Sequence, residues 1–180
     1  MSEARREIET VLREAEAWSA ALIDEQMNWR PVPGEWSAAE CLDHLTITCR
    51  RMMKAMDAGV DQLREKNQLY AGPAQPGLIG RCFLRILEPP VRKMKAKAPA
   101  DFVPQPDRPA YVVRSEFAAA HQELIQRLTE FESWDQNVRI VVSPFQARIR
   151  YSLGLSLKII PAHMRRHLWQ AREVLQQKSS

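Results

Sequence analysis

Four long stretches of the chain place apolar residues three and four positions apart, which is the spacing of one buried face on an α-helix. These stretches cover about residues 3–28, 37–67, 110–132 and 152–175. The second stretch illustrates the pattern, with apolar side chains at Cys41, Leu45, Cys49, Met52, Met56, Val60 and Leu63. Because long amphipathic helices must bury their apolar faces against one another, the sequence predicts an all-α fold built as a four-helix bundle.

Prolines and one capping motif indicate where these helices begin and end. The prolines within residues 31–33 cannot continue the first helix, so it must end before them. Ser37 and Glu40 have the spacing of a capping box, in which each side chain bonds a backbone N–H at the start of a helix. Pro161 interrupts the last apolar pattern. It either kinks a helix that begins near Ser152 or occupies the first turn of a shorter helix.

The middle of the chain has a different composition. Residues 70–110 contain eight of the 12 prolines and flank one short apolar segment, residues 78–87. This pattern predicts a long proline-rich crossover with a short helix. Residues 138–142 (VRIVV) are β-like but isolated, and they favour either a short strand or extended chain. With 180 residues and no internal repeat, the chain is expected to form a single domain over residues 1–180.

Composition and charge exclude several classes of protein. The hydrophobic content of 45% and the charged content of 27% are ordinary for a soluble globular protein. No apolar run approaches the ~20 residues that span a bilayer, and the charged N-terminus lacks the apolar core of a signal peptide. We therefore expect a cytoplasmic protein without a membrane partner.

Basic residues gather in two places, at Arg50, Arg51 and Lys54 and again within residues 92–97. The net charge is only +4, acidic residues are scattered throughout, and no nucleic-acid recognition motif is present. A solvated basic surface therefore explains these residues better than a nucleic-acid partner. The three cysteines lack C-x-x-C spacing, which argues against a disulfide framework or a zinc knuckle.

Three of the four histidines have positions that suit a metal site built on helices. His163 and His167 are four residues apart, so their side chains differ by about 40° around a helix axis and about 6 Å along it. Both imidazoles can therefore point at one ion, and His44 on the second helix is the best-placed third ligand. Three neutral imidazoles with one open position are typical of a catalytic divalent metal. The alternative is that these histidines lie in the core and bond carbonyls or one another.

His121 lies within the apolar face of the third helix, where it could serve as a fourth ligand or replace His44. Met164 follows His163 where the zinc-protease motif H-E-x-x-H has its glutamate, so that mechanism is excluded. The sequence shows no general base, and catalytic residues stay unassigned.

With unperturbed pKa values near 6.5, three imidazole ligands would lose a metal ion as the pH falls towards about 5.

Four further residues have a structural and a functional interpretation. Gln170 follows His167 by about one turn, so it could orient that ring from behind or simply pack. Trp29 and Trp36 flank the proline turn and are expected to clamp the connection between the first two helices. Arg166 either meets an anionic substrate or lies in solvent.

Three segments together resemble the DinB/YfiT-like family of metalloenzymes. They are the proline turn after Trp29, the block GEWSAAECLDHL, and the block HMRRHLWQA. The resemblance implies a four-helix bundle in up-down-down-up order with a three-histidine site. Matched position by position, the resemblance gives His44, His163 and His167 as ligands, and it selects His44 over His121. It also implies zinc or nickel as the metal and a homodimer as a common assembly.

The resemblance and the site chemistry lead to two classes of function. Characterised relatives in that family include transferases that use low-molecular-weight thiols such as mycothiol or bacillithiol, which implies an S-transferase. A metal-dependent hydrolase would use the same activation of a nucleophile. The alternative is a non-catalytic metal- or stress-responsive binding bundle that contacts nucleic acid through its basic faces.

Overall fold

The structure, a computed structural model, describes residues 2–90 and 98–178 and is mostly helical. The longest helices are α1 (Glu3–Ser19), α3 (Ala38–Glu65), α5 (Ala110–Glu132) and α6 (Leu153–Lys178). The shorter ones are α2 (Asp24–Met27), α4 (Leu78–Leu87) and the 3-10 turn η1 (Ala100–Phe102). The predicted helical character is thus confirmed, and α4 coincides with the short apolar segment of the crossover. The predicted basic cluster at residues 92–97 lies outside the described residues.

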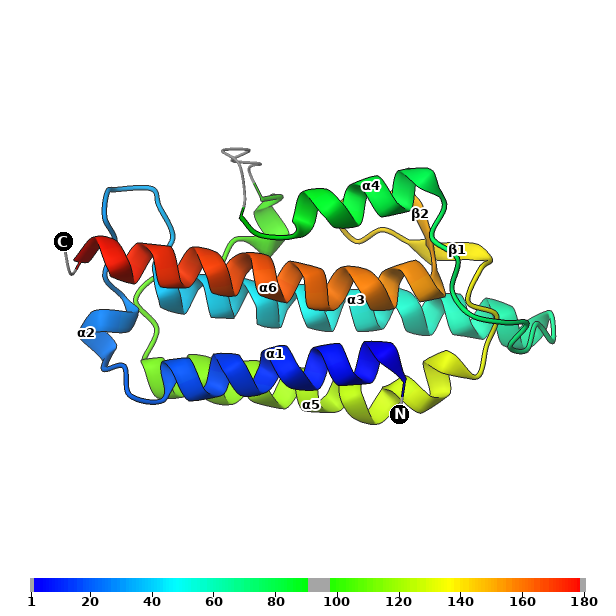
Figure 1. Cartoon of the computed structure of the whole chain (residues 1–180), viewed down its shortest axis with the longest axis horizontal. Helices are drawn as coiled ribbons and strands as arrows, with labels where there is room; N and C mark the ends of the chain where they lie inside the picture. Colours follow the sequence, from blue (N-terminus) through cyan, green and yellow to red (C-terminus); the bar gives the residue numbers. More distant parts are fainter. Residues whose placement is uncertain (1, 91–97, 179–180) are drawn as a thin grey trace.

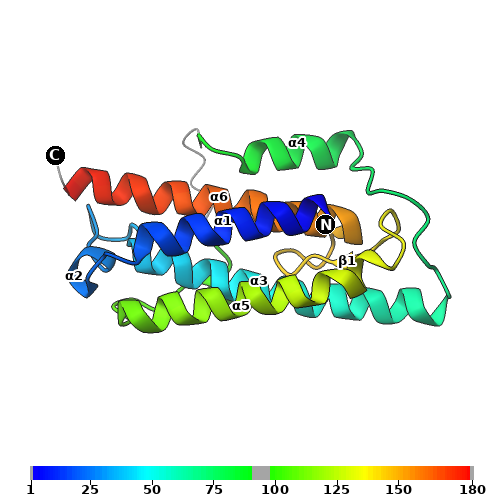
Figure 2. The same ribbon diagram turned by 60° about the horizontal axis from the view of Figure 1, so that its bottom comes forward.

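The four long helices lie side by side around a common core (Figures 1 and 2). α3 packs against α5 and α6, and α1 packs against the same two helices from the other side. α1 and α6 run in one direction, while α3 and α5 run in the opposite direction (Figure 1). α4 lies outside this group and packs on α6. Among the described residues, no helix is both long and apolar enough to cross a membrane.

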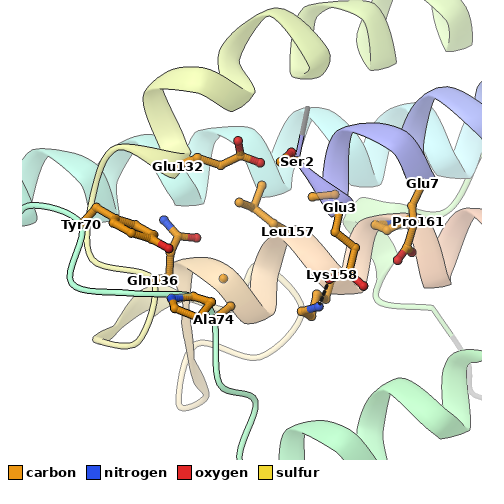
Figure 3. A pocket seen from close by; sticks show the side chains of 13 residues that line it. Ser2, Glu3, Glu7, Tyr70, Ala74, Glu132, Gln136, Leu157, Lys158 and Pro161 are labelled. Carbon is orange, nitrogen blue, oxygen red and sulfur yellow. Dashed lines mark hydrogen bonds and ion pairs between the residues drawn. The ribbon is translucent and has the colours of Figure 1, made fainter.

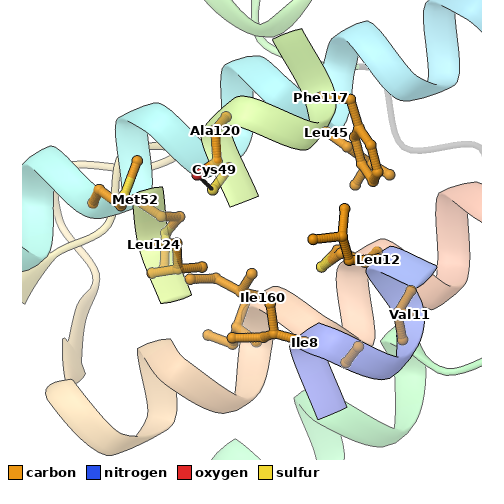
Figure 4. Close-up of a cluster of buried hydrophobic side chains, with 14 of the residues drawn as sticks. Ile8, Val11, Leu12, Leu45, Cys49, Met52, Phe117, Ala120, Leu124 and Ile160 are labelled. Atoms are coloured by element: carbon orange, nitrogen blue, oxygen red, sulfur yellow. Dashed lines mark hydrogen bonds between the residues drawn. The ribbon is translucent and has the colours of Figure 1, made fainter. Parts of the chain in front are cut away.

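The core is assembled from one apolar face of each long helix (Figure 4). Its central side chains include Ile8, Val11, Leu12, Leu45, Met52, Phe117, Leu124 and Ile160. Cys41 and Cys49 are buried as small apolar side chains, as the pattern predicts. Burial raises the pKa of the Cys49 thiol to about 12, and the thiol donates to the Ala120 carbonyl at 3.5 Å. Neither buried thiol is therefore a reactive nucleophile.

The first predicted helix is shorter than its apolar pattern suggested. α1 ends at Ser19, and a separate short helix, α2, follows. The Arg114 side chain on α5 donates to the carbonyls of Ser19 and Leu22 at 3.1 and 2.9 Å, so these carbonyls are satisfied without a continued helix. Asp24 in turn accepts from the backbone N–H of Ala110 at 2.8 Å and caps α5. The segment after the break at Ser19 thus supplies a hydrogen-bond acceptor for the first backbone N–H of α5.

Residues 138–142 are not isolated, contrary to the expectation from the sequence. β1 (Arg139–Val142) pairs with β2 (Arg150–Ser152) as a two-stranded antiparallel sheet. β2 leads directly into α6, and β1 packs on α3 beside Gly59. The sequence did not predict the sheet because β2 is only three residues long. A strand this short does not show the alternation of apolar and polar side chains that indicates β-structure.

α6 begins at Leu153 and contains Pro161, so this proline lies inside a helix that begins near Ser152 and not in the first turn of a shorter helix. A proline in a helix interior removes one backbone hydrogen bond, here the one that would reach the Leu157 carbonyl. The helix nevertheless continues to Lys178. His163 and His167 therefore lie on one continuous helix, as their spacing requires.

Gly154 marks a close approach at the start of α6, and its replacement should be costly. Its N–H donates to the Gln136 carbonyl at 3.0 Å, and a Cβ there would lie 2.9 Å from that oxygen and against the Ala74 side chain. We expect Gly154→Ala to lower the free energy of unfolding by about 1–3 kcal/mol in urea denaturation, because atoms must shift to relieve the overlap. Gly77→Ala is the control, since among the described residues no atom beyond its two chain neighbours lies within 4 Å of that added Cβ. Equal stability of the two variants would contradict the tight contact.

Candidate metal centre

The structure brings together the three histidines that the sequence singled out. One ring nitrogen from each of His44, His163 and His167 lies within 4.8 Å of the others. His44 comes from α3, and the other two come from α6. His44 and His167 are 3% and 8% exposed, and His163 is the more accessible member of the cluster.

His44 is held by a backbone acceptor in the crossover. α3 begins with the predicted capping box, in which Ser37 accepts from the Glu40 N–H at 3.2 Å and Glu40 accepts from the Ser37 N–H at 2.8 Å. His44 then lies on the second turn of α3, where its Nδ1 donates to the Phe102 carbonyl at 2.8 Å. Because this bond places the proton on Nδ1, the lone pair is on Nε2.

His167 is oriented in the same way by a side chain of its own helix. Its Nδ1 donates to Oε1 of Gln170 at 3.0 Å, which confirms the predicted contact behind this ring. Its Nε2 lies 3.1 Å from Nε2 of His163. Two of the three rings therefore have Nδ1 occupied by a protein acceptor and Nε2 directed towards the cluster, as in most histidine metal sites.

The cluster carries no net charge near neutral pH. Burial lowers the pKa of His163 to about 3, with further lowering from the nearby charges of His44 and Arg166. Burial also lowers the pKa of His167 well below its ordinary value, and His163 adds to the effect. Burial lowers the pKa of His44, although the Phe102 carbonyl opposes the shift. A metal ion requires neutral imidazoles, and these three are neutral before any ion arrives.

The donor set fits a divalent transition metal. At zinc–nitrogen distances of 2.0–2.1 Å, tetrahedral geometry separates two ligand nitrogens by about 3.3 Å. The 3.1 Å between Nε2 of His163 and Nε2 of His167 is close to that value. Without an ion, a proton on one of these nitrogens would serve as a hydrogen bond between the two rings, which is the packing alternative noted from the sequence. Imidazole ligands without a carboxylate suit zinc or nickel better than magnesium or calcium.

Aromatic side chains surround the cluster, and the sequence did not identify this arrangement. Trp36 lies over His44 and near His167, with ring centroids 4.7 and 5.9 Å apart, so it contacts the site as well as the connection before α3. Phe145 lies 6.1 Å from His163 and stacks on Phe102 at 4.5 Å. Trp36 was at least near His44 in sequence, whereas no local signal places Phe102 or Phe145 beside the histidines.

Ion pairs hold the crossover against the first turns of α3, next to His44. Asp43 is 4% exposed and accepts from Arg108 at 2.6 Å and from the Gln105 N–H at 3.0 Å. Arg30 bridges Glu40 at 2.8 Å and Asp107 at 2.9 Å. The Phe102 carbonyl that accepts from His44 therefore belongs to a segment that several ion pairs and hydrogen bonds hold against α3.

The remaining sequence candidates lie apart from the cluster. His121 is fully buried on α5, donates from Nδ1 to the Phe117 carbonyl at 2.8 Å, and does not belong to the three-histidine group. Arg166 donates to the Ile86 carbonyl at 3.1 Å, and its charge is close enough to contribute to the low pKa of His163. Arg166 is therefore partly buried and hydrogen-bonded to α4, an arrangement that neither of its two sequence interpretations described.

A larger hollow of about 460 Å³ lies between the first turns of α1 and α6 and the loop after α3 (Figure 3). None of the three histidines lines it. Three of its four charged side chains are paired, since Lys158 donates to Glu3 at 2.7 Å and Arg165 bonds Glu7 at 3.0 Å, and the fourth is Glu132. The hollow is thus separate from the candidate metal centre.

Three buried, neutral imidazoles that converge from two helices define a candidate metalloprotein. Comparison with family models agrees: the chain belongs to the DinB superfamily, whose members bind metal ions, and the model of that superfamily matches residues 7–171. The matched region runs from α1 into α6 and contains the whole cluster. No curated protein and no solved structure matched the chain.

Proposed function

We propose that this protein is an enzyme that binds one divalent ion, zinc or nickel, through His44, His163 and His167. The observation that carries the proposal is the convergence of three uncharged imidazoles within 4.8 Å. Among the described residues, no carboxylate or thiol joins the group. Three protein ligands leave at least one coordination position for a substrate, as in catalytic rather than structural zinc sites. We interpret the surrounding helices as the up-down-down-up four-helix bundle expected for a single domain with such a centre.

The chemistry of the site favours activation of a nucleophile. A divalent ion in this setting acts as a Lewis acid and lowers the pKa of a thiol or a water molecule. The chain itself supplies orientation, through the Phe102 carbonyl and Gln170, and aromatic side chains beside the histidines. The two carboxylates nearest His44 in sequence, Glu40 and Asp43, are paired with arginines and do not act as a general base.

A low-molecular-weight thiol is the nucleophile that best suits a site without a general base. A divalent ion held by His44, His163 and His167 would lower the pKa of such a thiol, which would lose its proton to solvent. The thiolate sulfur would then form a bond to an electrophilic carbon of the substrate as a leaving group departs from that carbon, which is the net reaction of an S-transferase. A hydrolase is the second form of the same proposal, with water in place of the thiol. Both forms require a metal ion at the three histidines, so metal content is tested first.

Elemental analysis of the purified protein, followed by anomalous scattering at the zinc and nickel edges, tests the proposal directly. One ion per chain at the three histidines would support it and identify the metal. A protein that contains no metal and takes up neither zinc nor nickel would overturn it.

Activity is then measured by mixing the metal-loaded protein with an electrophile, with and without a low-molecular-weight thiol. Product that requires the thiol supports the S-transferase, and product without it supports the hydrolase. The His167→Ala variant is the control for background reaction. Metal binding without turnover would instead support a non-catalytic binding bundle, and salt-dependent retention on DNA or RNA would extend that alternative to nucleic acid.

A further inference from the structure

A small cavity lies between α3, α5 and α6, and one histidine of the cluster, His163, lines it. Its volume is about 10 Å³, which is about the space that one water molecule needs. Three polar residues line it: Thr48 from α3, His121 from α5 and His163 from α6. The rest of the lining is apolar and includes Leu45, Cys49 and Met52, which Figure 4 shows on the core side of α3.

Two buried polar atoms at this cavity lack partners. His121 is 0% exposed, and because its Nδ1 donates to the Phe117 carbonyl, its Nε2 carries a lone pair. Thr48 is 4% exposed. Within the described part of the chain, neither Nε2 of His121 nor Oγ1 of Thr48 has a hydrogen-bond partner. Buried polar groups are almost always paired, with protein or with an ordered water.

His163 also differs from the other two histidines of the cluster. His44 and His167 each donate from Nδ1 to a protein oxygen, on Phe102 and Gln170. Nε2 of His163 faces His167. Among residues 2–90 and 98–178, no hydrogen bond joins Nδ1 of His163 to a protein acceptor, and this nitrogen is not one of the fully buried unpartnered atoms. A metal-binding histidine almost always donates its second N–H to a carboxylate, a carbonyl or a water.

We infer that one buried water molecule occupies this cavity and connects His163 to His121 and Thr48. The water donates one hydrogen to Nε2 of His121, shares a hydrogen bond with Oγ1 of Thr48, and accepts from Nδ1–H of His163. These bonds use the donors and acceptors of a single water. The hydrogen bonds of the water to His121 and Thr48 are inferred from the cavity and its unpartnered atoms alone. Its hydrogen bond to His163 rests on the proposed metal function.

The water gives Thr48 and His121 a role as positioning residues for a metal ligand that neither of them touches. An acceptor at Nδ1 holds the proton of His163 there, and the lone pair of Nε2 is then available to the ion. Without the water, His163 keeps its proton on Nε2, where it bonds His167 and must be displaced before metal can bind. Metal affinity should therefore depend on a hydroxyl on the far side of the cavity.

Thr48→Val tests this dependence, because it removes the hydroxyl and nearly preserves the shape of the side chain. We expect its dissociation constant for zinc to rise by about 10- to 100-fold in competition titrations with a chelating dye. Thr46→Val is the matched control, since Oγ1 of Thr46 donates to the Leu42 carbonyl at 3.1 Å and does not line the cavity. Thr48→Ser, which retains the hydroxyl, should restore affinity to within a few-fold of wild type. Equal affinity in Thr48→Val and wild type would overturn the link to the metal ligand.

A high-resolution crystal structure of the metal-free protein tests the water separately from metal binding. Density for a water within hydrogen-bond distance of Nε2 of His121 and Oγ1 of Thr48 would support the inference, and its loss in Thr48→Val would confirm the anchor. A dry cavity in the wild-type protein would overturn it. If the water is present but the protein takes up no metal, the proposed function fails while the water site stands.

Discussion

His163→Ala and His167→Ala should each abolish tight metal binding while the helical fold persists. Apparent binding free energies of four-ligand zinc sites are about 10–16 kcal/mol, so each ligand contributes several kcal/mol. Loss of one ligand of three should therefore raise the dissociation constant by about 100-fold or more. The apolar faces that hold α6 against α1 and α3 are unchanged, so the metal-free variants should still unfold cooperatively.

Elemental analysis and circular dichroism of the same samples measure the two parts of this prediction. His121→Ala is the control, because it removes a buried histidine outside the ligand group. With metal in excess, it should still hold one ion per chain, although with lower affinity if His121 supports the buried water. Unchanged metal content in His163→Ala would show that the assignment of this ligand is wrong.

The metal-free protein should lose stability as the pH falls from about 6.5 towards 4. Burial lowers the pKa of His121 to about 4, whereas the unfolded chain binds that proton near 6.5. Between these values the unfolded state binds more protons than the folded state, so the free energy of unfolding rises with pH and falls with acid. At pH 4.5, His121 alone should account for about 2–3 kcal/mol of the loss.

Urea denaturation at pH 7 and pH 4.5 measures this loss, with His121→Gln as the variant that cannot take up a proton. The stability of His121→Gln should fall by about 2–3 kcal/mol less than that of wild type over the same range. Equal losses in the two proteins would mean that His121 titrates near its ordinary pKa and is open to solvent.

The same reasoning changes the expected pH dependence of metal binding. Unperturbed imidazoles would release the ion near pH 5, but burial lowers the pKa of His163 to about 3 and also lowers that of His44 and His167. Protons therefore compete with the metal ion at a lower pH than they would at ordinary imidazoles, and this effect is clearest at His163. The increase in melting temperature caused by zinc or nickel should therefore persist at pH 5. A shift that disappears at pH 5 would indicate histidines with ordinary pKa values.

Local sequence signals predicted the parts of the fold that local interactions determine. The capping box at Ser37 begins α3 at the next residue, and the apolar pattern at 110–132 matches α5. The spacing of His163 and His167 predicted that both rings would reach one point, because helix geometry alone decides it. The contact of Gln170 with the His167 ring was predictable for the same reason, because Gln170 follows His167 by about one turn of the same helix.

Contacts between distant segments were not predictable from one sequence. The break after Ser19 depends on Arg114, which approaches from another helix, and β1 depends on a three-residue partner strand. The position of Phe102 above His44 depends on how the crossover docks on α3. The choice of His44 over His121 came from a family resemblance, because no periodicity within α3 specifies which side of α6 it will face.

The distribution of the three histidines between α3 and α6 has a consequence for biosynthesis. A ribosome produces α3 before α6, so a nascent chain contains only His44 of the cluster while residues 45–162 are being added. The complete site exists only after α6 has been made and has docked along α3. An ion held by all three histidines would therefore be acquired only after α6 has docked, and metal uptake can report that this helix has reached its place.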